Sequence, residues 1–229
     1  MKIIKGNIFT SECQTLVNTV NCVGVMGAGI ALECRLRYPE MYDKYIQLCT
    51  ENKINIGMLW IYKSPDKWIL NFPTKKHWKY PSKKEYLYTG LEKFLNTYQE
   101  KGVQSIAFPL LGADKGGIPQ EESLNIMTSY LNKADLEIEI YRYDATAEDD
   151  LYKKTKEWLL SQDIEHISIA TKLRKNYVAK VIDAVQSSNV VQLNQLAQVN
   201  GIGIKTLEKI FNLARSSSVN GRLNTELER

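Results

Sequence analysis

Histidine and cysteine are scarce in this sequence, which holds two His and four Cys among its 229 residues. The histidines, His77 and His166, lie far apart, and no two cysteines are spaced as CxxC. Zinc sites need closely spaced Cys and His ligands, so we expect no metal, and nothing else calls for a cofactor. All the cysteines fall in the first 50 residues. This distribution argues against a disulfide framework and predicts reduced thiols, as in a cytoplasmic protein.

Long apolar runs are missing as well. No apolar segment approaches the ~20 residues that span a bilayer. The first residues, "MKIIKGNIF", begin a strand pattern and lack the apolar core of a signal peptide. The net charge of +4 is mild and does not by itself require nucleic acid. We therefore expect a soluble, cytoplasmic monomer with no membrane partner.

The segments that are present alternate between strand and helix patterns up to about residue 143. Strand patterns cover "KIIKG", "TLVNTV", "MLWIYKS", "WILNFP", "SIAFPLL" and "EIEIYRY", and helix patterns cover "GIALECRLRYPEMYDKYIQLC", "KKEYLYTGLEKFLNTYQEKG" and "PQEESLNIMTSYLNK". Strands separated by helices indicate a layered α/β domain, which we place at 1–145.

The composition changes at "DATAEDD" (144–150), and only helix patterns follow. They cover about 149–161, 165–186, 190–199 and 203–215. We therefore predict a small all-helical module over 150–216 and a frayed tail over 217–229.

Two glycine runs follow apolar strands and lead into helices: "GVMGAGIA" in the segment 18–31 and "PLLGADKGGIP" at 109–119. Ligands of α/β sheets bind where strands end and loops enter helices. Glycines let backbone N–H groups face a phosphate, and a helix N-terminus adds partial positive charge. The alternative is a structural role in turns. Neither run is a Walker A loop or a GxGxxG in the first βα turn, and two runs favour two phosphates or a diphosphate.

The segments "IIKGNIF", "TLVNTVNCVGVMGAGIA" and "RYPEMY" resemble the opening of a macrodomain, the ADP-ribose-binding α/β/α module. "LNFPTKKHWKYPSKKEYLYTGLEKF" is similar to a narrower branch, the DarG-type DNA ADP-ribosyl glycohydrolases, antitoxins that remove ADP-ribose from DNA bases. The resemblance covers residues 1 to about 143. It implies a three-layer α/β/α fold with a central mixed sheet, and ADP-ribose as ligand and product.

The resemblance also implies the site. The diphosphate would lie between 23–30 and 110–117, Asn21 would face the distal ribose, and Lys75 would take the position of the catalytic lysine. The residues given to ADP-ribose binding are Asn7, Ile8, Asn21, Val25, Met26, Gly27, Gly29, Ile30, Leu111, Gly112, Ala113, Lys115, Gly116 and Gly117.

Three positions depart from the family pattern. Asn7 stands where many macrodomains have an Asp that accepts from the adenine amino group, so this contact loses its charge. Ala28 stands where branch members often have Lys, which removes one phosphate partner. Asp114 brings negative charge to the second glycine run, and Lys115 offsets it.

Cleavage of a base–ribose bond passes through an oxocarbenium-like state at the anomeric carbon. The glycine runs offer no carboxylate pair, so a lysine is the natural catalytic group. Lys75 lies beside Lys76 and four residues before Lys79, and both neighbouring charge and partial burial lower a lysine pKa. Asn21 would hold the ribose hydroxyls. The alternative for this segment is a solvated basic loop, in which Trp78 either stacks on a nucleobase or covers the core.

The segment "LNQLAQVNGIGIKTLEKIFNLA" (193–214) resembles a helix-hairpin-helix element. The matching residues are Leu196, Val199, Gly201, Ile202, Gly203 and Ile210. Leu207 departs from the pattern, which usually has a small residue there. The resemblance implies that the turn presents backbone N–H groups to a DNA phosphate, and the DNA-binding residues would be Gly201, Gly203, Lys205 and Lys209.

The charge of this part of the chain also favours nucleic acid. Residues 166–215 hold seven Lys or Arg against Asp183 and Glu208, a net charge of +5. The alternative is a glycine-linked helix pair that packs on the first domain or on a partner protein.

Three functions remain open from the sequence. The first is a hydrolase that removes ADP-ribose from ADP-ribosylated DNA bases. The second is a non-catalytic reader of ADP-ribose or a related nucleotide, coupled to DNA. The third is an adaptor whose helical module neutralises a cognate ADP-ribosyltransferase toxin.

Overall fold

The computed structural model describes residues 1–227, with side chains for residues 1–216. The chain forms two compact units, Met1–Asp144 and Ala145–Arg229. The predicted tail at 217–229 begins inside the last helix. Its last two residues, 228 and 229, lie outside the described residues, and the tail stays a prediction.

The first unit is built on one six-stranded sheet with the order β1-β6-β5-β2-β4-β3. Its strands are β1 (Lys2–Gly6), β2 (Thr15–Asn21), β3 (Trp60–Lys63), β4 (Trp68–Lys75), β5 (Ser105–Pro109) and β6 (Glu137–Tyr143). All neighbours pair in parallel except β3, which runs antiparallel to β4. The predicted mixed sheet is confirmed.

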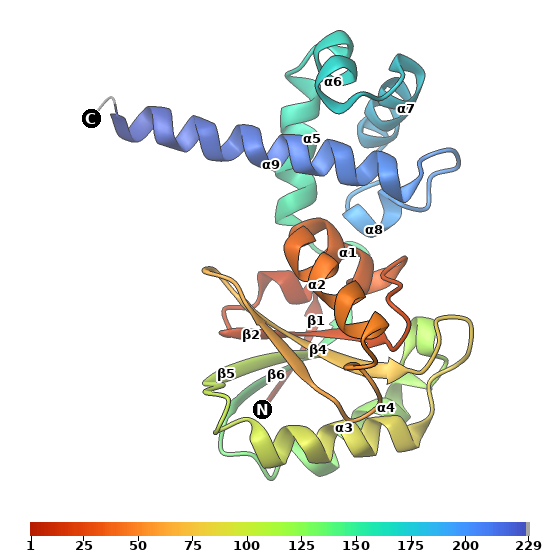
Figure 1. The fold of residues 1–229 in the computed structure, drawn as a ribbon, viewed down its shortest axis with the longest axis vertical. Coiled ribbons are helices and arrows are strands. Elements are labelled where there is room, and N and C mark those ends of the chain that lie inside the picture. The colour runs from red at the N-terminus through yellow and green to blue at the C-terminus, as the bar shows by residue number, and fades with distance from the viewer. Residues whose placement is uncertain (228–229) are drawn as a thin grey trace. The chain divides into compact units, whose positions relative to one another are not determined.

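Helices cover both faces of this sheet, as Figure 1 shows, with α1 and α2 on one face and α3 and α4 on the other. They are α1 (Gly29–Arg37), α2 (Pro39–Thr50), α3 (Lys84–Thr97) and α4 (Gln120–Leu131), with short 3₁₀ helices η1 (Ile8–Thr10) and η2 (Asp114–Gly116). The helix pattern around Pro39 is broken at this proline into two helices, as the sequence predicts, because proline suits the first turn of a helix but not its interior. The three-layer α/β/α architecture is confirmed.

Alternation along the strands divides the core between the two faces. On β2, Leu16 packs in the cluster with α1 and α2, whereas the next residue, Val17, packs in the cluster with α3 and α4. Ala107 and Phe108 of β5 divide in the same way. Successive side chains of a strand point to opposite faces, so a doubly covered sheet needs continuously apolar strands.

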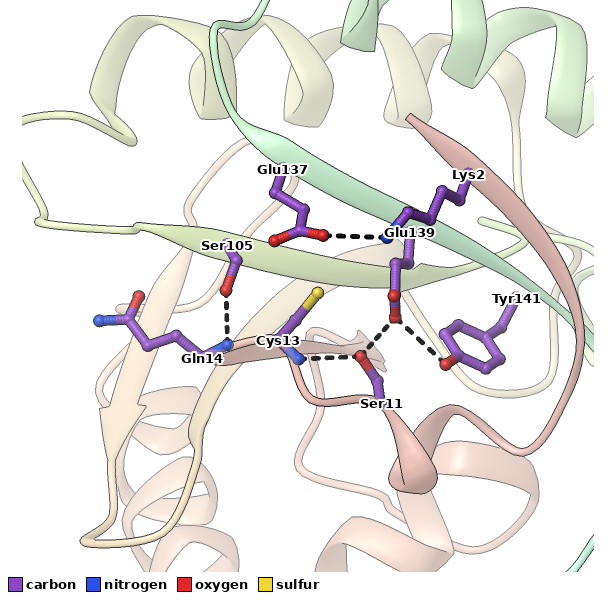
Figure 2. Close-up of polar contacts among 8 residues, drawn as sticks. All are labelled: Lys2, Ser11, Cys13, Gln14, Ser105, Glu137, Glu139 and Tyr141. Carbon is purple, nitrogen blue, oxygen red and sulfur yellow. Dashed lines mark hydrogen bonds and ion pairs between the residues drawn. The ribbon is translucent and has the colours of Figure 1, made fainter.

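A polar network lies where the parallel strands begin, shown in Figure 2. Ser11 Oγ donates to Glu139 at 2.6 Å, and Tyr141 Oη donates to the same carboxylate oxygen at 3.1 Å. Burial raises the pKa of the Cys13 thiol beside them, which keeps it protonated and a poor nucleophile. This network joins β5, β6 and the segment before β2, and it lies at the edge opposite the glycine runs.

The second unit is helical, as predicted. Its helices are α5 (Asp150–Leu160), α6 (Ile164–Thr171), α7 (Lys175–Gln186), α8 (Leu193–Leu196) and α9 (Ile204–Leu227). The single helix pattern at 165–186 is divided in two at Lys172, whose φ of 54° is left-handed. Thr171 Oγ1 donates to the carbonyl of Ile167 and accepts from the N–H of Leu173, and both bonds end α6.

Asp149 links the starts of two helices in the second unit. Asp149 accepts from the N–H of Tyr152 and from the N–H of Leu193, each at 3.0 Å, so it caps α5 and fixes the start of α8. Tyr152 Oη donates to the carbonyl of Val190 at 2.7 Å. Leu207, the departure from the hairpin pattern, is fully buried in this unit.

Membrane-spanning helices and metal-binding clusters are both absent from the described residues. Among the helices of this part of the chain, none combines the length and the apolar character that crossing a membrane requires. The same residues hold no group of three or more His, Cys, Asp or Glu side chains that could bind a metal.

Candidate active site

Strand order brings the predicted site residues to one edge of the sheet. Strands β5, β2 and β4 are neighbours and run parallel, so their carboxyl ends meet. The loops that leave these ends are 22–28, 76–83 and 110–119, which carry both glycine runs and the segment after Lys75. This edge is where α/β sheets bind their ligands.

Asn21 closes the first of these loops upon itself. Its Oδ1 accepts from the N–H groups of Val23 and Val25, at 3.0 and 3.3 Å, and its Nδ2 donates to the carbonyl of Val25 at 2.5 Å. Tyr45 Oη donates to the Asn21 carbonyl at 2.6 Å. Since Oδ1 is engaged, the remaining N–H of Nδ2 is the group of Asn21 that suits a ribose hydroxyl.

In the rest of the first loop, a ligand would contact main-chain groups more than side chains. Met26 is fully buried, so only its main chain can meet a ligand, whereas Val25 and Gly27 are exposed. The loop ends at α1, whose N-terminal residues Gly29 and Ile30 are half-buried. Free N–H groups of a helix N-terminus favour an anion, and the first turn of α1 has no acidic residue.

The second glycine loop is tightly folded. Gly112 has a φ of 66°, and a Cβ there would lie 2.9 Å from Ile118 Cδ1, so only glycine fits. The loop then makes the short helix η2 and ends at Gly117, which is left-handed. Leu111, Ala113 and Gly116 are buried, whereas Lys115 and Gly117 are exposed. Asp114 accepts from Gln120 Nε2 at 3.1 Å, so its carboxylate is engaged with the start of α4.

Lys75 connects the two glycine loops. It ends β4, where its register partner is Asn21 of β2. Its Nζ donates to the carbonyl of Lys115 in the second loop. Burial lowers the pKa of the Lys75 amine, and burial is one of the two causes that the sequence suggested. A lysine with a lowered pKa can serve as acid, base or nucleophile.

Asn7 and Ile8 follow β1, an edge strand that is separated from β4 by three other strands. Asn7 is buried, and its Oδ1 accepts from the N–H of Phe9 at 3.1 Å, which caps η1. The carbonyl that was expected to accept from adenine therefore already has one donor. An oxygen with two lone pairs leaves room for a second, so the adenine role stays a prediction.

Several residues at this edge were missed by sequence reasoning. Ser82 donates its N–H to the carbonyl of Gly116 at 2.8 Å, and its buried Oγ has no hydrogen-bond partner among the described residues. Arg35 Nη1 donates to the carbonyl of Met26 at 3.4 Å and brings positive charge to the loop where Ala28 offers none. Arg35 lies outside the quoted motifs, Ser82 lies in the segment 70–94 without an assigned role, and the fold brings both residues to this edge.

The second unit carries the predicted DNA-binding residues. Gly201 has a φ of 85° and forms the turn before α9, while Ile202 is buried beneath it. Gly203 immediately precedes α9, and Lys205 and Lys209 are exposed one helical turn apart, on one face. These four residues do come together at one turn and the helix that follows it.

Lys180 is a fifth residue at this turn. A Cβ added at Gly201 would lie 2.6 Å from Lys180 Nζ, so this ammonium group rests directly on the glycine. Lys180 comes from α7, and its place at the turn could not be predicted from spacing. The basic character of the turn is therefore greater than the hairpin motif alone indicates.

The chain is similar to known proteins in sequence and in fold. The Macro domain family model matches residues 17–127. A DNA ADP-ribosyl glycohydrolase of Thermus aquaticus is 41% identical over 126 residues, which make up 53% of this chain and 35% of that protein. The chain thus spans 35% of the length of that curated relative.

Solved structures extend the comparison. The macrodomain of Thermus aquaticus DarG matches with a TM-score of 0.59 and 38% identity, covering 62% of this chain and 97% of that one. Thermosipho africanus DarTG, solved in complex with ADP-ribose, matches with a TM-score of 0.59 and 30% identity, covering 65% of this chain and 43% of that one.

Proposed function

This chain belongs to the macrodomain family, and we propose that it hydrolyses the bond between ADP-ribose and a DNA base. The observation that carries the proposal is Lys75, an amine with a pKa lowered by burial that lies between both glycine loops and beside Asn21. The similarity to a DNA ADP-ribosyl glycohydrolase and to a protein solved with ADP-ribose supports the same substrate.

In this proposal the diphosphate lies between the two glycine loops, close to the N-terminus of α1. The distal ribose then lies near Asn21 and Lys75, which are register partners on the neighbouring strands β2 and β4. Water adds across the base–ribose bond, so the anomeric carbon gains the hydroxyl and the base nitrogen gains the proton. The neutral Lys75 amine accepts that proton from the attacking water, and the ammonium group so formed then gives it to the departing base.

The release of ADP-ribose from DNA tests this proposal. We would incubate the protein with oligonucleotides that carry ADP-ribose on thymine or on guanine and measure free ADP-ribose. Lys75→Ala should lower turnover by roughly 10²-fold or more, the contribution of an acid–base group, while ADP-ribose still binds. Lys93→Ala, an exposed lysine of α3, serves as the matched control and should keep full turnover.

Two outcomes would reject the hydrolase. Equal turnover of Lys75→Ala and the wild-type protein would make Lys75 a surface charge. Binding of ADP-ribose with no release from either oligonucleotide would favour a reader of ADP-ribose.

We further propose that the second unit binds the DNA backbone of the substrate. Support comes from the turn at Gly201, the free N-terminus of α9, and three lysines at this turn, Lys180, Lys205 and Lys209. Such contacts go to phosphates and carry no sequence preference. The helical unit would then increase affinity for modified DNA through these phosphate contacts.

A further inference from the structure

The five residues after Lys75, Lys-His-Trp-Lys-Tyr at 76–80, form an exposed loop that the proposed chemistry does not use; we call it the KHWKY loop. Trp78 is 48% exposed and Tyr80 is 66% exposed. Neither ring belongs to a hydrophobic cluster of the first unit, so Trp78 does not cover the core. Two large rings therefore face solvent directly beside the candidate catalytic lysine.

The rings of this loop are held in place by contacts within it. His77 stacks on Trp78, with ring centroids 5.7 Å apart and planes at 25°, and lies 5.5 Å from the Tyr80 ring. His77 Nδ1 accepts from the N–H of Lys79, and the His77 carbonyl accepts from the N–H of Tyr80, each at 3.2 Å. His77 is thus a half-buried support that contacts both neighbouring rings, which stay exposed to solvent.

The loop is also fixed to both glycine loops. The N–H of Cys22 donates to the carbonyl of Lys76 at 3.3 Å, which ties it to the first. The N–H of Ser82 donates to the carbonyl of Gly116 at 2.8 Å, which ties the segment that follows it to the second. The exposed rings therefore border the place where a modified base would enter.

Charge in this segment has one sign. Residues 75–84 contain five lysines and no acidic residue. In the described part of the chain, neither Lys76 nor Lys79 pairs with a carboxylate, and Lys79 Nζ lies 5.2 Å from the centroid of the Trp78 ring. Alternating cations and open ring faces suit a polyanion that carries flat, unpaired bases.

We propose that the KHWKY loop is a platform for single-stranded DNA on either side of the modified base. Trp78 and Tyr80 stack on unpaired bases, and Lys76 and Lys79 contact the phosphates between them. A duplex keeps its base faces covered, so it cannot use these rings. The proposal rests on the proposed function for the identity of the nucleic acid.

Binding of unmodified oligonucleotide to the full chain tests the platform. The probe is a fluorescent DNA strand of about ten nucleotides without ADP-ribose, single-stranded or annealed, measured by anisotropy at several salt concentrations. Trp78→Ala with Tyr80→Ala should weaken binding of the single strand by about tenfold or more, and the Phe substitutions at both positions should restore most of it. Tyr88→Ala is the control, because that exposed ring already stacks on Tyr130.

The lysines have a separate readout. Lys76→Gln with Lys79→Gln should reduce the salt slope for the single strand by about 1.4, near 0.7 for each phosphate that no longer has a lysine partner. Lys44→Gln with Lys93→Gln, two exposed lysines elsewhere in this unit, should leave the slope unchanged. Calorimetry with free ADP-ribose should give the same affinity for all these variants, which also shows that they fold.

Three results would overturn the platform: no binding of the single strand by the wild-type chain, equal affinity after loss of both rings, or a ring effect as large for duplex as for single strand. Because the probe carries no ADP-ribose, this outcome is independent of hydrolysis. A loss with the Ala variants would support the platform even if the wild-type chain released no ADP-ribose.

Discussion

At the residue scale, Lys75 combines a chemical property with a position. Its amine is partly buried at the end of β4, which lowers its pKa, and it reaches the second glycine loop through the carbonyl of Lys115. The charged form loses hydration there, so the neutral form is populated at a lower pH than in an exposed lysine. The proposed role of this amine in turnover therefore predicts a pH dependence.

We expect kcat/KM to rise with pH and to level off above a pKa that lies below the usual lysine value of 10.5. The sign follows because burial favours the neutral amine, and only the neutral amine accepts a proton. Lys75→Arg should lose activity at every pH, since a guanidinium stays protonated. A rate that falls as the pH rises would instead make the ammonium form the active one.

Asn21 is expected to serve the loop as well as the ligand. Asn21→Ala leaves the N–H groups of Val23 and Val25 without their acceptor, which should lower the free energy of unfolding by about 1–3 kcal/mol. Turnover should fall too, because the ribose loses a hydrogen-bond partner. Urea unfolding and the oligonucleotide assay measure the two effects. Thr19→Ala, on the same strand, is the control. Unchanged stability of Asn21→Ala would show that the loop keeps its conformation without the hydrogen bonds of Asn21.

At the element scale, the two glycine loops differ in what they tolerate. Gly117 ends η2 at a φ of 83°, so any side chain there strains the backbone before it meets a ligand. Gly27 is exposed and is not among the residues with positive φ, so a side chain can be accommodated there. A large acidic side chain at either position should block a diphosphate. Substitution of Gly27 should do so without straining the backbone.

Gly27→Glu should abolish ADP-ribose binding while leaving the midpoint of thermal unfolding unchanged. The carboxylate occupies the place proposed for the diphosphate and repels it. Calorimetry measures the affinity, and Thr50→Glu, which adds the same charge at the end of α2, controls for net charge. Gly117→Glu should lose binding with some loss of stability. Wild-type affinity in Gly27→Glu would remove the diphosphate from this loop.

At the scale of the whole molecule, one unit holds the proposed ADP-ribose site, whereas both units hold residues proposed to contact DNA. Met1–Asp144 holds every residue proposed for ADP-ribose, and Ala145–Arg229 holds the turn proposed for DNA. Of the two glycines that the hairpin pattern places in this turn, Gly201 is the one that a side chain would strain. Gly201 has a positive φ, whereas a Cβ at Gly203 would meet nothing within 4 Å.

Removal of residues 150–229 should leave affinity for free ADP-ribose unchanged and weaken binding to a modified oligonucleotide, most strongly at low salt. Lys205→Ala with Lys209→Ala should reduce the salt slope by up to about two, near one per lysine–phosphate pair. Gly201→Val should act more strongly than either lysine, because it distorts the turn. Anisotropy at several salt concentrations measures all of these, and equal slopes for the full and shortened chains would favour a protein-binding role.

The sequence by itself determined the layers and most of the elements. Apolar strands separated by amphipathic helices require a sheet covered on both faces. The glycine runs and Lys75 lie in short segments that are recognisable from the sequence. It also predicted that burial would lower the pKa of Lys75. The layers and elements depend on neighbours in the chain, which is why periodicity and composition reveal them, whereas the choice of Lys75 rested on the resemblance to the DarG-type branch.

Only the tertiary structure decided which groups meet. In the first unit, strand order places Lys75 beside Asn21, and the second glycine loop brings the Lys115 carbonyl to the Lys75 amine. In the second unit, helix packing brings Lys180 of α7 onto Gly201. Such contacts join residues far apart in the chain. They depend on how the layers pack, because packing selects one strand order among several that the same local pattern allows.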